Sequence, residues 1–318
     1  MSAMTVLGHP AEWLRRRVLD VIALPGRGTG IDYTRPAGDA GLFGPDSVVW
    51  TIHADFPGMM AGGICALMLQ ALHPLALAGV YNHSDFRRDP LGRLRRTIAF
   101  VSATTYAPTA GAQRQIERVL AIHRTVCGVA LDGRKYSACD PELLTWVHCA
   151  EMWSFLHGYM CYRHARLPIA VQDRYYDETR RVAEALGARD VPRSAAGMDA
   201  YFARLRPELG CDARTLEVLG VLDNIRLPVP AAPWVRALFV GAGAALLPDW
   251  ASRMLGRAGR ARQRRDRRAK RLLRCSAPML RAAMAGSREG IVARASRRVG
   301  ADPARYYRVP TPGASSAS

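Results

Sequence analysis

Residues 112–126 read AQRQIERVLAIHRTV and carry the clearest secondary-structure signal in the chain. Their apolar side chains and one histidine recur with the i, i+3, i+4, i+7 spacing of a single helix face: Ile116, Val119, Leu120, His123 and Val126. The arginines lie off that face: Arg114, Arg118 and Arg124. The segment is therefore predicted to be an amphipathic helix that points His123 into the protein.

Helical patterns continue on both sides of this segment, from Pro57 to Gly210. Another helix is predicted to begin at Asp140, because an N-cap aspartate is followed there by Pro141, a residue favoured at the first helical position. This helix carries His148. We find no convincing pair of alternating strands. The sequence predicts an all-α fold, a single helical bundle with a basic C-terminal segment that is helical or partly disordered.

The longest apolar stretch is Met59 to Val80, which has the length of a membrane span but contains Pro74. A proline inside a helix removes a backbone hydrogen bond and breaks or bends the helix. The stretch is therefore predicted to be a buried helix that turns at Pro74, with a membrane span as the alternative. Two later helices are predicted, one ending at Gly187 and one over Met198 to Leu205.

Length and composition indicate a globular protein. The chain has 318 residues, of which 49% are hydrophobic, enough for a substantial core. Its seven cysteines are odd in number and include no CxxC pair, so we expect reduced thiols rather than a disulfide framework or a zinc ribbon. No convincing targeting segment precedes the helices, which favours a cytoplasmic location.

The net charge of +18 is concentrated near the C-terminus. Residues 253–308 hold eighteen arginines and lysines against three acidic residues. We therefore divide the chain into an N-terminal arm (1–44), a helical domain (45–250) and an Arg-rich C-terminal segment (251–318). The arm contains the run GRGTG at Gly26 to Gly30, which is predicted to be a loop rather than a phosphate-binding turn, because no helical pattern follows it.

Three further blocks occur in a fixed order along the helical domain: LHPLALAGVYNHSDFRRDPLGRLRRT (72–97), AIHRTVCG (121–128) and YSACDPELLTWVH (136–148). Together they resemble the DUF2236 family, which includes the rubber oxygenase (latex clearing protein) and the MpaB oxygenase. The resemblance covers about Asp46 to about Leu209.

This resemblance implies haem b, bound inside the helical bundle, as the cofactor. Matched by motif, it implies that His123 is the proximal iron ligand and that Arg93 and Thr97 lie on the distal side of the iron. Positions 93 and 97 are one helical turn apart and share a face. Rubber oxygenase has a lysine that caps the iron just before the threonine. This chain has Arg96 there, and a guanidinium that stays protonated cannot ligate iron.

Each of the candidate residues on these helices has more than one interpretation. Arg93, Arg95 and Arg96 could hold haem propionates, since a guanidinium matches a carboxylate bidentately, or could form a solvated basic face. Thr97 could hydrogen-bond near bound oxygen or only to the preceding helical turn. His148 is a ligand, a base near the haem or a structural histidine.

The resemblance favours an enzyme that uses O₂ or peroxide to oxidise an apolar or isoprenoid-like small molecule. Cleavage of a C=C bond is the reaction known for the family, and a hydroxylase, peroxidase or dehydrogenase would use the same centre. A di-iron carboxylate site is disfavoured because the chain has no Glu-x-x-His motif. The alternative is a basic helical protein that contacts nucleic acid or anionic lipid through its Arg-rich segment. The oligomeric state stays open.

Overall fold

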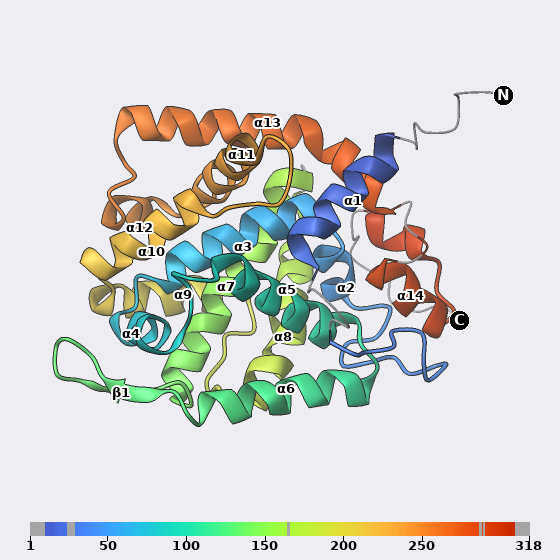
Figure 1. Ribbon diagram of the computed structural model, residues 1–318. Helices are drawn as coiled ribbons and strands as arrows, with labels where there is room; N and C mark the ends of the chain where they lie inside the picture. Colours follow the sequence, from blue (N-terminus) through green and yellow to red (C-terminus); the bar gives the residue numbers. More distant parts are fainter. Residues whose placement is uncertain (1–9, 24–28, 164–165, 286–287, 289, 309–318) are drawn as a thin grey trace.

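The computed structural model describes residues 10–23, 29–163, 166–285, 288 and 290–308 (Figure 1). Helices dominate these residues, which confirms the predicted all-α fold. The first seven α-helices are α1 (Pro10–Ile22), α2 (Val48–His53), α3 (Phe56–Gln70), α4 (Pro74–His83), α5 (Pro90–Tyr106), α6 (Thr109–His123) and α7 (Pro141–Arg163). The others are α8 (Ile169–Ala185), α9 (Ala195–Leu205), α10 (Ala213–Asn224), α11 (Ala232–Ala244), α12 (Asp249–Met254), α13 (Arg260–Ala285) and α14 (Ile291–Arg298). Two short 3₁₀ helices are η1 (Arg206–Glu208) and η2 (Pro303–Tyr307).

One small antiparallel hairpin links α6 to α7. Its strands are β1 (Cys127–Val129) and β2 (Lys135–Ser137), with Gly128 opposite Tyr136. The sequence predicted no strand pair, and this prediction is wrong for residues 127–137. Each strand has only three residues and buries little beyond Tyr136, so neither shows the alternation on which strand prediction depends.

The centre of the bundle is the pair α3 and α7, whose backbones touch. A Cβ atom built on Gly62 of α3 would lie 2.7 Å from the carbonyl oxygen of Ser154 on α7. One built on Gly158 of α7 would overlap the carbonyl of Gly58 on α3. Only glycine permits this approach, because any other residue adds a carbon where the partner backbone already lies. The main hydrophobic core surrounds this pair.

The apolar stretch Met59–Val80 forms α3 and the start of α4, as predicted, with Pro74 as the first residue of α4. The two helices meet at 104°. His73 is the N-cap residue of α4 and accepts a hydrogen bond from the amide of Ala76. Among the described residues no single helix is long and apolar enough to cross a membrane, and the bent pair α3–α4 could do so by length and composition alone.

The predicted helix boundaries around α7 and α8 are confirmed. Helix α7 begins at Pro141, after Asp140, whose carboxylate accepts a hydrogen bond from the amide of Glu142. Helix α8 ends at Ala185, two residues before Gly187. Gly187 has a φ of +104°, a conformation that favours glycine and ends the helix.

The N-terminal arm is attached to the C-terminal part of the chain. Arg298, buried at the end of α14, donates to the carbonyls of Asp39, Tyr33 and Tyr106, the last at 2.9 Å. Residues 26–28 of the GRGTG run lie outside the described residues.

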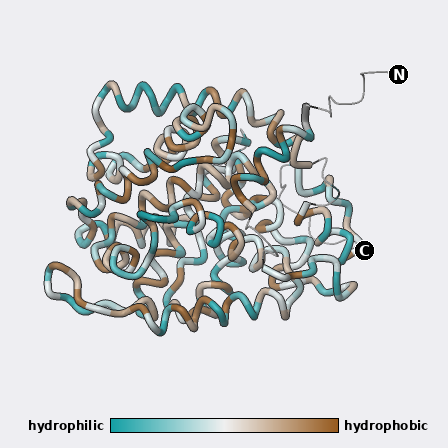
Figure 2. Tube along the Cα trace, in the orientation of Figure 1, coloured by the Kyte–Doolittle hydropathy of each residue, from teal (hydrophilic) through white to brown (hydrophobic). Residues whose placement is uncertain are grey.

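Within the Arg-rich segment, α13 runs along one edge of the molecule (Figure 1) and packs on α11, α3 and α1. Its hydropathy alternates along its length, as Figure 2 shows. One face is buried and consists of Asp266, Ala269, Leu273, Ala277, Leu280 and Arg281. The buried Asp266 pairs with the buried Arg257, whose Nη2 lies 3.0 Å from Oδ1. The domain boundaries 44/45 and 250/251 stay predictions, but residues 260–285 are part of the packed core.

Candidate functional site

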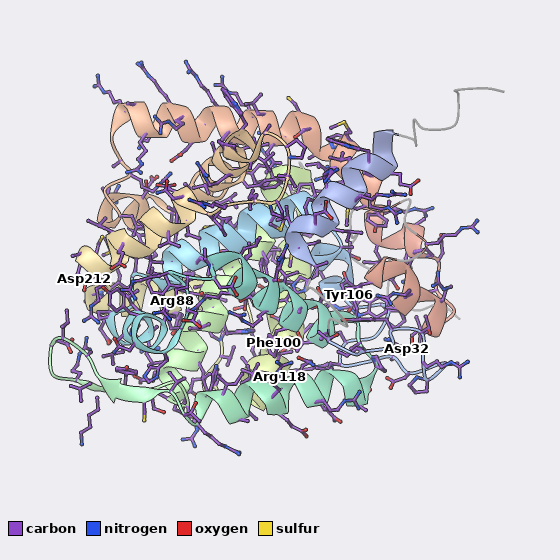
Figure 3. All side chains as sticks on the ribbon, viewed as in Figure 1. Asp32, Arg88, Phe100, Tyr106, Arg118 and Asp212 are labelled. Atoms are coloured by element: carbon purple, nitrogen blue, oxygen red, sulfur yellow. The ribbon has the colours of Figure 1, made fainter. Side chains whose placement is uncertain are left out.

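Except for His148 on α7, the candidate residues lie on the hairpin of α5 and α6, which is closed at one end. The two helices are joined by Ala107 and Pro108, and they diverge toward the start of α5 and the end of α6 (Figure 1). The half of α5 next to the turn is mostly buried, whereas every residue from Pro90 to Phe100 keeps some exposure. In Figure 3, Phe100 of α5 and Arg118 of α6 mark the region where the two helices face each other.

His123 is the last residue of α6 and lies half-buried on the same face as the buried Ile116, as predicted. Burial lowers the pKa of its imidazole, because a charged ring loses hydration there. Its Nδ1 is buried and has no hydrogen-bond partner in the described part of the chain. The ring is therefore neutral at pH 7 and has a nitrogen that the protein does not use.

Arg93 is a partly buried cation without a counterion. Its Nη1 donates to Ser84 Oγ at the end of α4, and among the described residues it forms no ion pair. Burial, with a smaller effect of the nearby Arg96, lowers the pKa of the guanidinium. A buried charge without a partner is unfavourable, so this position fits an anionic group of a ligand.

The other candidates on α5 already have protein partners. Thr97 is exposed, and its Oγ1 donates to the carbonyl of Arg93 at 3.3 Å, the bond to the preceding turn. Arg95 donates from Nε to the carbonyl of Val21 at 2.9 Å, which ties α5 to the end of α1. Arg96 lies 3.3 Å from Asp89 in an exposed ion pair. The haem roles of Thr97, Arg95 and Arg96 stay predictions.

Two titratable groups share a face of α7, one turn apart: His148 and Glu151. Burial lowers the pKa of His148 to about 4 and raises the pKa of Glu151 to about 7. No hydrogen bond or ion pair of either side chain occurs within the described residues. Glu151 is not among the predicted site residues. A carboxylate in the middle of a helix that is otherwise rich in buried apolar side chains is the signal that could have indicated it.

Other histidines in the region are structural. His53 uses both ring nitrogens, with Nδ1 2.8 Å from Thr105 Oγ1 and Nε2 2.9 Å from the hydroxyl of Tyr175. Burial lowers its pKa to about 3. His83 contacts the hydroxyl of Tyr136 through Nε2 at 3.1 Å. His123 differs from both because its buried nitrogen has no such partner.

The donor set fits haem iron better than a bare metal ion. Over the described ranges, no group of three or more His, Cys, Asp and Glu side chains could hold a metal ion. A haem would need only one imidazole from the protein, and it would supply the redox chemistry itself. His123 can provide that imidazole, and Arg93 can face a propionate or a developing negative charge.

The fold and the site together define an all-α domain in which, among the described residues, the buried Nδ1 of His123 has no partner. The family model described as "ER-bound oxygenase mpaB/B'/Rubber oxygenase, catalytic domain" matches residues 50–288. The chain belongs to this oxygenase family. The match confirms the resemblance seen in the sequence and extends past Leu209 to the end of α13. No curated protein and no solved structure matches the chain.

Proposed function

We propose that the chain is a haem-b-dependent oxygenase that oxidises an apolar small molecule with O₂ or peroxide. One observation carries the proposal: the neutral, half-buried imidazole of His123 has a buried nitrogen without a protein partner. Family membership supports oxygenase chemistry, and the cofactor and the substrate class are the proposed parts.

In this proposal, His123, Arg93 and Glu151 each have a separate chemical role. His123 holds the iron, and the bound haem supplies the redox chemistry that activates the oxidant. Arg93 provides a fixed positive charge for a propionate or for negative charge that develops on oxygen. Glu151 has a pKa near neutrality, so its carboxyl can donate or accept a proton at pH 7 without a large free-energy difference.

An apolar substrate fits the side chains of the diverging helices. Ile98 and Phe100 on α5 and Val119 on α6 are apolar and only half-buried. Half-buried apolar side chains gain free energy when a ligand removes them from water. The proposal of an isoprenoid-like substrate rests on the family resemblance.

The test is an absorption spectrum of the purified chain after reconstitution with haemin. A Soret band at one haem per chain, together with O₂ consumption in the presence of an apolar alkene, would support the proposal. A chain that folds but retains no haem after gel filtration would contradict it.

A second candidate function concerns the outward face of α13, where the arginines Arg264, Arg265, Arg268 and Arg271 are exposed. Leu272 and Met279 share this surface and are 63% and 60% exposed. Basic residues beside exposed apolar side chains fit an anionic lipid surface better than nucleic acid. Co-sedimentation with anionic and with neutral vesicles, alongside a duplex-DNA binding assay, distinguishes these partners.

A further inference from the structure

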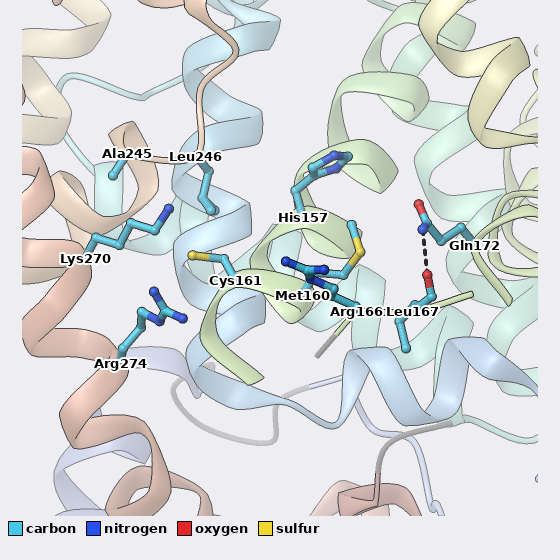
Figure 4. A pocket seen from close by; sticks show the side chains of 10 residues that line it. All are labelled: His157, Met160, Cys161, Arg166, Leu167, Gln172, Ala245, Leu246, Lys270 and Arg274. Atoms are coloured by element: carbon cyan, nitrogen blue, oxygen red, sulfur yellow. Dashed lines mark hydrogen bonds between the residues drawn. The ribbon is translucent and has the colours of Figure 1, made fainter. Parts of the chain in front are cut away.

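A hollow lies at the opposite edge of the molecule from α6. It is lined by the end of α7, the start of α8, the end of α11 and the middle of α13 (Figures 1 and 4). Its volume is about 580 Å³, which is within the range of small-molecule sites. None of the residues predicted for the oxygenase site lines it.

Three cations converge on this hollow. Lys270 and Arg274 lie one turn apart on α13 and extend toward α7, and Arg166 reaches in from the segment before α8 (Figure 4). Among the described residues that line the hollow, none is acidic. Within the described ranges, none of the three has an ion-pair partner, in contrast to the buried Arg257 and Arg281, which both pair with aspartates. Like charges this close repel each other, so an anion between them would stabilise the arrangement.

The rest of the wall is largely apolar. Met160 of α7, Leu167 before α8 and Leu246 after α11 line the hollow, and Leu167 is buried. Gln172, the one amide in the wall, donates to the carbonyl of Leu167 and is therefore already engaged (Figure 4). Apart from its charged end, a ligand in this space can be apolar, because apolar groups gain free energy when they are removed from water.

We propose that this hollow binds an anionic amphiphile, with a carboxylate or phosphate head between Lys270, Arg274 and Arg166 and its hydrocarbon part against Met160, Leu167 and Leu246. A free phosphate ion would satisfy the cations and leave the apolar wall in water. A neutral hydrocarbon would fill the wall and leave the cations uncompensated. Only a molecule with both parts matches both features.

The site does not depend on the haem proposal, because α13 and α6 lie at opposite edges of the bundle (Figure 1). The two proposals can therefore fail separately.

Isothermal titration calorimetry on the full chain tests the site. The probes are decanoate and decyl phosphate, each below its critical micelle concentration, with decanol and inorganic phosphate as the two half-ligands. The variant that should lose affinity for both amphiphiles is Lys270→Gln/Arg274→Gln. The matched control is Arg260→Gln/Arg267→Gln, which removes two charges from exposed positions of α13 that line neither the hollow nor the proposed lipid-binding face.

We expect both amphiphiles to bind at one molecule per chain and more tightly than either half-ligand. Their relative affinities identify the preferred head group. The Lys270/Arg274 variant should lose about tenfold or more in affinity, because it removes two cations that would form charge-assisted hydrogen bonds to the head group. The control should change affinity less than about twofold, as expected for screened surface charges. Equal loss in both variants, equal binding of decanol, or inorganic phosphate binding as tightly as decyl phosphate would overturn the proposal.

Discussion

Arg281 of α13 forms a buried ion pair with Asp55, the N-cap residue of α3, although 226 residues separate them in the sequence. Arg281 Nη2 also donates to the carbonyl of Tyr162 at 2.6 Å. Asp55 in turn accepts the amide of Gly58 at 3.0 Å, which caps α3. One guanidinium therefore connects the basic C-terminal helix to both central helices.

Replacing Arg281 by alanine should lower the free energy of unfolding by about 3–5 kcal/mol, because the Asp55 carboxylate would remain buried without its partner. Urea denaturation followed by circular dichroism measures this loss. Arg264→Ala, on the exposed face of the same helix, is the control and should change stability by no more than about 0.5 kcal/mol. Similar small effects of both variants would mean that the buried pair does not contribute to stability.

Deletion of residues 253–318 should prevent stable folding rather than remove an accessory tail. The deletion removes Arg281 and the apolar face of α13 that covers α11 and α3. The measurement is the yield of soluble monomeric or oligomeric chain in gel filtration, with thermal unfolding of whatever is soluble. A truncated chain that unfolds cooperatively at the temperature of the full chain would contradict this packing.

His123→Ala should abolish haem retention, because it removes the imidazole proposed as the axial ligand. His148→Ala should keep haem if His148 is structural. Haem content per chain after gel filtration, from the pyridine haemochrome spectrum, measures both. The opposite pattern, with haem lost only in the His148 variant, would assign the ligand to α7 instead of α6.

Arg93→Ala should slow turnover by about 10²- to 10³-fold while haem stays bound, because it removes a fixed positive charge that would stabilise developing negative charge. Thr97→Val keeps the side-chain shape and deletes the hydroxyl, so its effect should be smaller. Arg114→Ala is the control, since Arg114 is exposed on α6, off the helix face that carries His123. Full activity at full haem occupancy in both test variants would show that Arg93 and Thr97 are not distal residues.

Stability should depend on Glu151 between about pH 4.5 and pH 7. Burial raises the pKa of this carboxyl from 4.5 to about 7, so the folded chain keeps its proton over a range in which the unfolded chain has lost it. Stability therefore falls as pH rises through this window. Glu151→Gln removes the effect, and its advantage over the wild type should grow with pH by up to about 3 kcal/mol. Urea denaturation at pH 5 and pH 8 measures the change. If the stability advantage of Glu151→Gln is equal at pH 5 and pH 8, the Glu151 carboxyl is exposed to water rather than buried.

The sequence predicted the elements whose local signals are strong. Asp140 followed by Pro141 located the start of α7, and Pro74 located the bend after α3. It did not predict the packing of α13, because Ala269 and Ala277 on its buried face add little hydropathy among so many arginines. The buried charge of Arg281 was also not predictable, since its partner Asp55 comes from a distant helix.

The candidate site also combines features that local sequence signals predict with contacts between distant helices that they do not predict. The helical spacing around His123 predicted an inward-pointing imidazole, and the structure places it half-buried on the face of Ile116. Spacing could not show that Arg95 contacts the end of α1 or that Glu151 is half-buried without a partner among the described residues, because both depend on which helices meet in space.

The glycine contact between α3 and α7 also determines where this enzyme can be re-engineered. Any side chain at Gly62 or Gly158 would push the two central backbones apart. The position of the α7 face that carries His148 and Glu151 is therefore fixed relative to α3. The hairpin of α5 and α6 has no such constraint over its diverging half. A directed-evolution library aimed at new substrates should therefore vary the half-buried apolar positions of α5 and α6 and leave the glycines unchanged.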